Sequence, residues 1–253
     1  MTPHLHVRID DHILRLILAR AEKKNAISNE MYAAMTEALV RAETDSDVRV
    51  VLFEAEGDTF CAGNDLAEFA AVAAGTLKPA ELKAHAFLNA VARATKPYVA
   101  AVHGHAVGIG LTLLLHCDLV FVAEDAALST PFANLALVPE AASSLLLPAR
   151  IGHARAYAMF ALGESIDGKT AATLGLANAA VPAAQVRDRA LAAAKALCSR
   201  PTGALQATKR LMRDAESICA VMGREIEVFG ERLKSREAME AFRAFAQGKK
   251  VGG

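Results

Sequence analysis

The sequence predicts an α/β protein in which a parallel sheet is followed by a helical C-terminal region. Strand-like and helix-like segments alternate up to about residue 181, and from Pro182 onward the pattern is helical only. Such alternation is typical of parallel strands joined by helices. The chain has 253 residues, 53% of them hydrophobic, which is enough to bury a sizeable core in one domain with at most an appendage.

The N-terminal part predicts a hairpin, a helix and a buried strand. Apolar segments at 5–9 and 13–18 flank an Asp-Asp pair, which indicates a hairpin. Ser28 can cap a helix, because Met and Ala residues recur after it at helical spacing. Residues 48–53 are almost all apolar, as expected of a strand that is covered on both faces.

The middle of the chain continues this alternation. Helices are expected over 66–74 and 79–94, and Pro79 is well placed to start the second of them. A turn from Gly104 to Gly110 leads into a helix that ends near residue 116. The other elements expected before Pro182 are strands at 98–102, 119–123 and Ala177–Val181, and helices at about 143–150, 153–162 and Lys169–Leu174.

The charge balance and the absence of several motifs argue against several classes of function. Lys and Arg together number 28, as do Asp and Glu, so the net charge is zero and no groove for nucleic acid is expected. The sequence has no P-loop, no GxGxxG fingerprint, no GxSxG elbow and no HExxH motif. His103 and His105 form an H-x-H pair without further ligands nearby, so we expect turn and core histidines and no metal site.

The cysteines and the N-terminus favour a cytoplasmic protein that is not bound to a membrane. The four cysteines lie far apart without a CxxC motif, which is typical of reduced thiols. Charged residues precede any apolar run at the N-terminus, so no signal peptide is expected. Residues 98–117 carry no Asp, Glu, Lys or Arg, but their histidines and glycines favour a buried strand, turn and helix over a membrane span.

Two glycine-containing segments, Phe60–Leu66 and Gly104–Gly110, each follow a predicted strand and open a helix. Each therefore presents backbone N–H groups at a helix N-terminus, where the helix dipole favours negative charge. Two such donors that converge on one point form an oxyanion hole. The alternative interpretation is a pair of ordinary strand-to-helix turns.

These two segments resemble the paired oxyanion-hole loops of the crotonase superfamily, also called the enoyl-CoA hydratase/isomerase family. The resemblance covers most of the chain through short motifs that occur in the same order. They are Lys23–Ser28, Lys96-Pro97, Cys117–Leu119, Leu135–Glu140, Gly163–Val181 and Thr208–Met212.

The resemblance implies a crotonase-like spiral of β-β-α units over residues 1–181, which carries the acyl-CoA site. It implies a C-terminal helical region over 182–253 for covering and oligomerisation, in a homotrimer or a dimer of trimers. The family holds a thioester enolate with two backbone N–H groups, which by position belong to Ala62 and Ile109. The residues expected to bind the substrate are Lys24, Gly63, Asn64, Asp65, Gly108, Gly110 and Phe132.

Two of these binding residues have a simpler alternative. Lys24 either meets the phosphates of CoA or is a solvated surface charge. Asp65 fits a helix cap and loop organiser better than a base.

The general bases decide the reaction. Hydratases of this family use two glutamates, but the matching positions here carry Thr112 and Phe132. A carboxylate appears instead at Glu140, where peroxisomal-type Δ3,Δ2-enoyl-CoA isomerases place their catalytic glutamate. A 1,3-proton shift needs only one base, and apolar neighbours raise the pKa of a buried carboxyl group into a useful range. The alternative is that Glu140 only caps a helix that begins near Ala141.

The expected function is therefore isomerisation of a 3-enoyl-CoA to a 2-enoyl-CoA, with Glu140 as the single acid/base. The CoA thioester is the substrate, and no cofactor is expected. The alternatives are an enoyl-CoA hydratase of fatty-acid β-oxidation, an isomerase of ring-derived CoA esters, and a non-catalytic acyl-CoA-binding protein.

Overall fold

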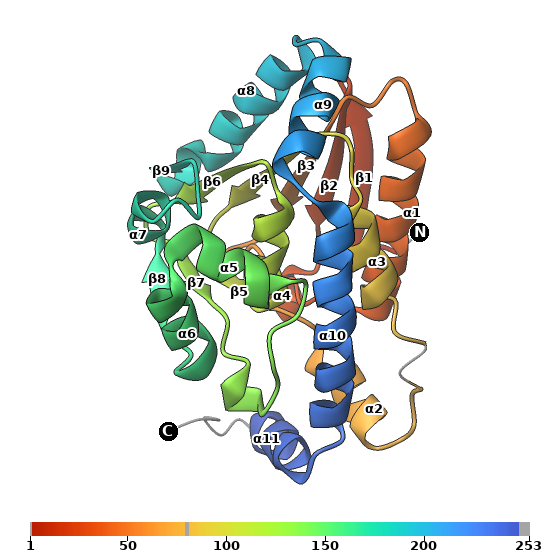
Figure 1. Ribbon diagram of the computed structural model, residues 1–253, viewed down its shortest axis with the longest axis vertical. Coiled ribbons are helices and arrows are strands. Elements are labelled where there is room, and N and C mark those ends of the chain that lie inside the picture. The colour runs from red at the N-terminus through yellow and green to blue at the C-terminus, as the bar shows by residue number, and fades with distance from the viewer. Residues whose placement is uncertain (1, 79–80, 248–253) are drawn as a thin grey trace.

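A six-stranded sheet in the order β1-β2-β3-β4-β6-β9 forms the centre of the molecule (Figure 1). A computed structural model describes residues 2–78 and 81–247. β1 and β2 form the predicted antiparallel hairpin, and the later pairings in this sheet are parallel. The strands are β1 (Leu5–Asp10), β2 (Ile13–Leu18), β3 (Val50–Ala55), β4 (Tyr98–Val102), β6 (Leu119–Ala123) and β9 (Ala179–Val181).

A second sheet of three short strands, in the order β5-β7-β8, was not predicted. Its strands are β5 (His105–Val107), β7 (Ala127–Ser129) and β8 (Ser165–Asp167). Three residues are too few to show the alternation by which a strand is recognised in a sequence. Gly104 turns the chain from β4 into β5 with φ +61°, and a Cβ at this position would lie 1.9 Å from the carbonyl oxygen of Asp58.

Helices surround the two sheets (Figure 1). Ser28 caps α1 as predicted, because its hydroxyl accepts a hydrogen bond from the N–H of Met31. The segment predicted as one helix from 110 to 116 is a short α-helix followed by a 3₁₀ turn. The helices before Pro182 are η1 (Ala21–Lys23), α1 (Asn29–Thr44), α2 (Leu66–Ala73), α3 (Ala84–Ala92), α4 (Ile109–Thr112), η3 (Leu113–His116), η4 (Ala133–Leu135), α5 (Ser143–Ile151), α6 (His153–Ala161) and α7 (Gly168–Thr173).

The start of α3 differs from the prediction. Pro79, which was expected to begin this helix, lies outside the described residues, and α3 begins only at Ala84. The side chain of Asn29 on α1 explains this later start. Its amide donates to the carbonyl of Glu81, and its carbonyl accepts from the N–H of Lys83. These hydrogen bonds tie Glu81 and Lys83, just ahead of α3, to α1.

The chain beyond Pro182 is helical, as predicted, and covers the sheets. α8 (Val186–Cys198) packs on β3, β4 and β6, while α10 (Ala215–Leu233) packs against α2, α3 and α5. α11 (Arg236–Ala246) packs on α2 and η4. The remaining helical elements are η5 (Ala183–Gln185) and α9 (Thr202–Met212).

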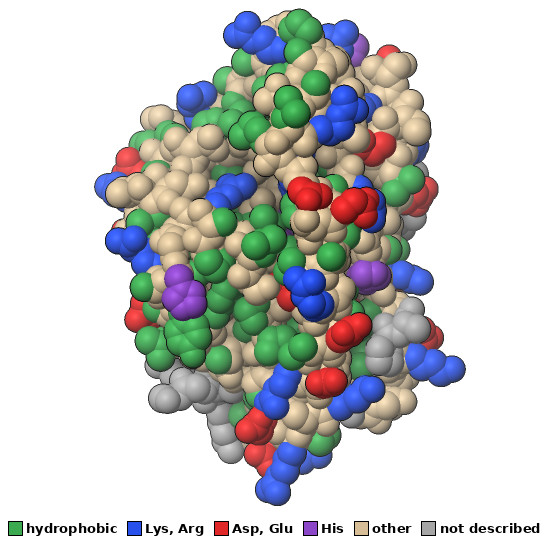
Figure 2. All heavy atoms as spheres, in the orientation of Figure 1, with side chains coloured by type: hydrophobic (Ala, Val, Ile, Leu, Met, Phe, Trp, Pro, Cys, Tyr) green, Lys and Arg blue, Asp and Glu red, His purple; other side chains and the backbone are tan. Residues whose placement is uncertain are grey.

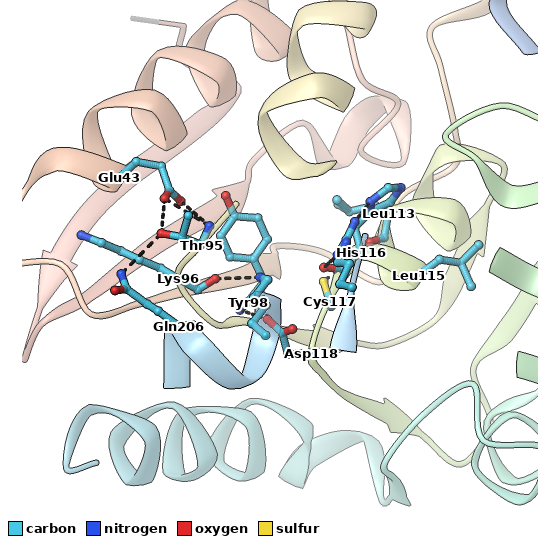
Figure 3. A network of polar contacts seen from close by, with 12 residues as sticks. Glu43, Thr95, Lys96, Tyr98, Leu113, Leu115, His116, Cys117, Asp118 and Gln206 are labelled. Atoms are coloured by element: carbon cyan, nitrogen blue, oxygen red, sulfur yellow. Dashed lines mark hydrogen bonds and ion pairs between the residues drawn. The ribbon is translucent and has the colours of Figure 1, made fainter. Parts of the chain in front are cut away.

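An ion pair between the buried Lys209 and the exposed Asp118 ties α9 to the sheet. The ammonium of Lys209 donates to Asp118 over 2.8 Å and lies 4.4 Å from the ring centroid of Tyr98. Asp118 also accepts from the N–H of Tyr98, and Figure 3 shows these two residues side by side. The ammonium of Lys209 also donates to the carbonyl oxygen of Lys96 over 2.7 Å, so two contacts join α9 to the segment around β4.

Hydrophobic side chains also reach the surface. Figure 2 shows a group of them over α5 and α6, where Leu145, Tyr157 and Leu162 are exposed. Leu211 and Met212 at the end of α9 are 89% and 83% exposed. None of the helices in the described part of the chain is both long and apolar enough to cross a membrane.

Candidate active site

A cavity with a volume of about 900 Å³ lies between the two predicted loops and the C-terminal helices. It is lined by Ala62, predicted as an oxyanion-hole donor, and by most of the predicted binding residues: Lys24, Gly63, Asn64, Asp65, Gly108 and Phe132. The rest of the wall is largely apolar and includes Leu66, Phe69, Leu135, Leu137, Phe229 and Phe242. A cavity of this kind, mostly apolar with a few polar groups in its wall, is typical of a site for an organic ligand.

The two loops are hydrogen-bonded to each other along the backbone. The N–H of Cys61 donates to His105 over 3.0 Å, and the N–H of Val107 donates to Cys61 over 2.9 Å. Gly110 allows this approach, because a Cβ there would lie 2.6 Å from the carbonyl oxygen of Cys61. Gly110 was expected to bind substrate, but it is buried and does not line the cavity. Its role in the structure is close packing of the two loops.

The backbone N–H of Ala62, expected in the oxyanion hole, is already used. It donates to the carbonyl of Lys24 over 2.9 Å, so it is not free to receive an oxyanion. The sequence could not reveal this contact, since it depends on how two distant loops meet. Within the described chain, by contrast, the N–H groups of Asn64 and Ile109 have no acceptor. Asn64 is further fixed by the hydroxyl of Tyr32, which donates to its Oδ1 over 2.5 Å.

Asp65 and Lys24 are held by contacts at the edge of the cavity. Asp65 is the N-cap of α2, where it accepts from the N–H of Ala67, and it pairs with Arg20 over 2.8 Å. Asp65 is thus a cap and loop organiser, as the sequence analysis favoured. The exposed ammonium of Lys24 pairs with Asp58 over 2.7 Å.

Glu140 is buried beside α4, with 8% of its surface exposed. The hydroxyl of Thr112, the last residue of α4, donates to its carboxylate over 2.6 Å. Burial raises the pKa of Glu140 from 4.5 to about 7, against the opposing effect of this hydrogen bond, and the charge of Glu225 adds to the rise. A carboxyl group with a pKa near 7 can both accept and return a proton at neutral pH.

Glu140 does not cap a helix. α5 starts at Ser143, and the carboxylate of Glu140 is bonded to Thr112 instead. Neither Glu140 nor Ile109 lines the cavity, although their neighbours Leu137 and Gly108 do. Because α4 is a single helical turn, the hydroxyl that binds Glu140 is only about 5 Å along the helix axis from the N–H of Ile109.

The turn after Glu140 is strained. Ala141 and Ala142 both have left-handed backbones, with φ of 61° and 55°. This conformation costs a residue with a Cβ about 1–2 kcal/mol. Two such residues in succession persist only where surrounding contacts hold them, and strain of this kind is often found at functional sites.

Phe132 completes the apolar wall. Its side chain is buried and packs on Phe160 with ring centroids 6.0 Å apart. Neither this ring nor the hydroxyl of Thr112 can act as a carboxylate base. In the described residues, no group of three or more His, Cys, Asp or Glu side chains is placed to hold a metal ion.

Comparison with known proteins supports the resemblance found in the sequence. The sequence model described as "Enoyl-CoA hydratase/isomerase" matches residues 8–251. The enoyl-CoA delta isomerase 2 of Rattus norvegicus is 32% identical over 238 residues, which are 92% of this chain and 61% of the rat protein. The chain thus spans less than two thirds of that relative.

Two further relatives match along almost their whole length. A probable enoyl-CoA hydratase of Bacillus subtilis is 31% identical, over 95% of each chain. The solved structure of Pseudomonas aeruginosa OdaA has a TM-score of 0.92 at 42% identity, covering 96% of this chain and 99% of that one. The predicted α/β crotonase-like fold is confirmed. The relatives are named both isomerase and hydratase, so their names do not distinguish the two reactions.

Proposed function

Because the chain belongs to the enoyl-CoA hydratase/isomerase family, we propose that it isomerises a 3-enoyl-CoA to a 2-enoyl-CoA. The observation that carries this proposal is the buried carboxyl group of Glu140, whose pKa is raised to about 7 beside α4. The proposed reaction needs one group that takes a proton at one carbon and returns it at another. A carboxyl group that titrates near neutral pH is suited to both steps.

In the proposed mechanism, Glu140 removes a proton from carbon 2 of the 3-enoyl thioester. The electron pair of that C–H bond moves into the carbonyl group and gives an enolate, whose negative oxygen is stabilised by hydrogen bonds from the N–H groups of Asn64 and Ile109. The dienolate then takes the same proton back at carbon 4, and the double bond ends between carbons 2 and 3. Atoms and charges balance with substrate and Glu140 alone, so no cofactor or metal is required.

Asn64 replaces Ala62 as the proposed donor from the first loop. The N–H of Ala62 is bonded to Lys24, whereas the N–H of Asn64 has no acceptor in the described structure. The Tyr32 hydrogen bond to the side chain of Asn64 gives this donor a fixed position. Preorganised donors of this kind need no rearrangement when charge develops.

Hydration of a 2-enoyl-CoA is less well supported by the site. Hydration requires groups that orient and deprotonate a water molecule and protonate carbon 2. The two positions at which family hydratases carry glutamates hold Thr112 and the buried ring of Phe132. Glu225 is a second carboxylate near Glu140, but both of its oxygens accept hydrogen bonds from Ala142 or Ser144.

The same cavity gives the proposed binding mode. Its apolar part, formed by side chains from α2, η4, α10 and α11, is suited to the acyl group. Lys24 and its neighbour Lys23 lie at the polar part and are proposed to meet the phosphates of CoA. We also propose that the chain forms a homotrimer or a dimer of trimers.

The test is turnover of 3-enoyl-CoA and 2-enoyl-CoA, measured side by side, by the wild type and by Glu140→Gln. We expect the wild type to act on the 3-enoyl-CoA, and Glu140→Gln to lower its turnover by about 10²–10⁴-fold with little change in thioester binding. Glu164→Gln, at an exposed glutamate, is the matched control and should leave turnover unchanged.

Other outcomes would contradict the proposal in different ways. Near-wild-type turnover by folded Glu140→Gln would refute the one-base mechanism. Hydration of 2-enoyl-CoA without isomerisation would make the protein a hydratase. Stabilisation by CoA thioesters without turnover of either substrate would make it a non-catalytic binder.

A further inference from the structure

The start of α5 is capped by a side chain from another helix. Ala142, at the N-cap of α5, has no side chain that can accept a hydrogen bond from the first turn. Glu225 of α10 takes this role: its Oε2 accepts from the N–H of Ala142 over 2.6 Å, and its Oε1 accepts from the N–H of Ser144 over 3.0 Å and from the Ser144 hydroxyl over 2.5 Å. The Glu225 side chain is buried. A carboxylate at a helix N-terminus is also favoured by the helix dipole.

These contacts fall on the strained turn that follows Glu140. Ala141 and Ala142 have left-handed backbones, and Glu225 binds the second of them directly. His116 binds the first, since its Nε2 lies 2.8 Å from the carbonyl oxygen of Ala141. The two contacts come from different elements, one from α10 and one from the end of η3.

His116 is itself held in place by Arg213. Its Nδ1 is hydrogen-bonded to Arg213, which also donates to the His116 carbonyl over 3.0 Å. Burial and the charge of Arg213 lower the pKa of His116 to about 3, so the ring is neutral and donates from Nε2. Figure 3 shows His116 next to Cys117 and Asp118, ahead of β6.

We propose that Glu225 is a positioning residue, whose carboxylate holds the left-handed turn at Ala141 and Ala142 so that the side chain of Glu140 meets Thr112 and the substrate. This proposal rests on the proposed function for its catalytic consequence. Its structural part does not, because the contacts of Glu225 and Glu140 are independent of which reaction the protein catalyses.

Glu225 also acts on Glu140 through its charge. Several groups surround Glu140: Thr112 of α4, Glu225 of α10, His116 of η3, Tyr32 of α1 and Cys61 of the first loop. Burial keeps the last three neutral near pH 7, since it raises the pKa of Tyr32 and Cys61 and lowers that of His116. Burial is the main cause of the raised pKa of Glu140, and the negative charge of Glu225 adds to it. Burial also raises the pKa of Glu225, whereas its hydrogen bonds from Ser144 and Ala142 favour the charged form. Removal of the charge of Glu225 should therefore shift the titration of Glu140 to lower pH.

The test compares Glu225→Gln with Glu227→Gln, an exposed glutamate two residues further along α10. The glutamine amide keeps the size of the side chain but loses one acceptor and the charge. We expect kcat of Glu225→Gln to fall about 10–100-fold with KM nearly unchanged, because small displacements of a catalytic group cost this much. The acidic limb of its kcat profile should move to lower pH, while Glu227→Gln should behave as the wild type.

A second readout does not depend on activity. The carboxyl group of Glu140 can be followed by carbon-13 NMR in protein labelled at glutamate, with its signal assigned by the loss seen in Glu140→Gln. A lower titration midpoint in Glu225→Gln supports the proposal even if the wild type lacks isomerase activity, an outcome that would refute the proposed function alone. An unchanged midpoint together with unchanged kcat in folded Glu225→Gln would overturn the proposal.

A milder variant covers the case in which Glu225→Gln does not fold. Ser144→Ala removes one of the three hydrogen bonds to Glu225 and leaves the two backbone contacts. We expect faster hydrogen exchange at the N–H groups of residues 142 and 144 and a measurable change in the Glu140 midpoint. If neither changes in Ser144→Ala, Glu225 does not position this turn.

Discussion

Thr112 and Glu140 are joined by a 2.6 Å hydrogen bond in which the threonine hydroxyl is the donor. Thr112 stands where family hydratases carry a glutamate, and Glu140 lies 28 residues further along the chain. A position that would hold one base in a hydratase thus orients the proposed base, Glu140, here. The hydrogen bond also favours the charged form of Glu140 and limits the rise in pKa that burial causes.

Replacing Thr112 by Val should therefore impair catalysis at neutral pH. Without the hydroxyl, the pKa of Glu140 should rise further, so a smaller fraction is ionised at pH 7 and the acidic limb of the kcat profile moves to higher pH. Each lost ~1.4 kcal/mol of hydrogen bonding corresponds to about a tenfold loss of the ionised form. Thr112→Ser keeps the hydroxyl and is the control. A pH profile that stays in place in folded Thr112→Val would contradict this role.

Glu140 should also make the protein less stable as the pH rises. Its pKa is raised from 4.5 in the unfolded chain to about 7 in the folded protein, so the folded state binds more protons between these values. The free energy of unfolding therefore decreases as pH increases through this range. From pH 4 to pH 8 the loss is on the order of 3 kcal/mol at most.

Denaturant unfolding of the wild type and Glu140→Gln at several pH values measures this effect. Glu140→Gln should gain stability relative to the wild type as pH rises from 5 to 8, since glutamine does not ionise. A constant difference between the two proteins over this range would show that Glu140 does not titrate there.

Two glycine-to-alanine substitutions should have opposite effects. Gly110→Ala brings a Cβ within 2.6 Å of the Cys61 carbonyl and should separate the two loops, with a loss of stability of more than about 1 kcal/mol and of most activity. Gly223→Ala is the matched control within α10, where a Cβ would meet no atom within 4 Å. It should stabilise the protein by up to about 1 kcal/mol through helix propensity. Thermal melts and turnover measure both, and equal stability of the two variants would contradict the packing argument.

Self-association should depend on the C-terminal helical region. Light scattering at micromolar concentration should give the mass of a trimer or a multiple of it, because Leu211 and Met212 leave apolar surface to be covered. Replacing both by Asp should lower the mass, and Val40→Asp, an exposed position on α1, should leave it unchanged. A monomeric wild type at this concentration would contradict the prediction.

The strands of the large sheet were predictable because each carries its own pattern. β4 and β6 were located to the residue, and the hairpin to within one residue, since runs of buried aliphatic side chains are visible in the sequence alone. The second sheet was missed because its strands have three residues each. The pairing of these strands depends on Gly104 and on contacts with the first loop, and neither can be recognised from the residues of the strands alone.

The sequence predicted which loops form the candidate site, but not which backbone N–H groups of those loops are without an acceptor. The position of Glu140 followed from the family resemblance, whereas the choice between Ala62 and Asn64 depends on a hydrogen bond from Ala62 to Lys24. Glu225 was missed for a similar reason. It accepts a hydrogen bond from the N–H of Ala142, which lies 83 residues away in the sequence. In the sequence it is one of several acidic residues on an amphipathic helix.

The backbone bonding between the loops at Cys61 and Ala106 has a consequence for how this scaffold can diverge. The proposed thioester donors are main-chain groups, carried on segments that other main-chain groups hold in place. Replacing the side chain at position 112, 132 or 140 should therefore leave these proposed main-chain donors in place. One or two substitutions at these positions should therefore change the reaction catalysed without loss of the proposed main-chain contacts to the thioester.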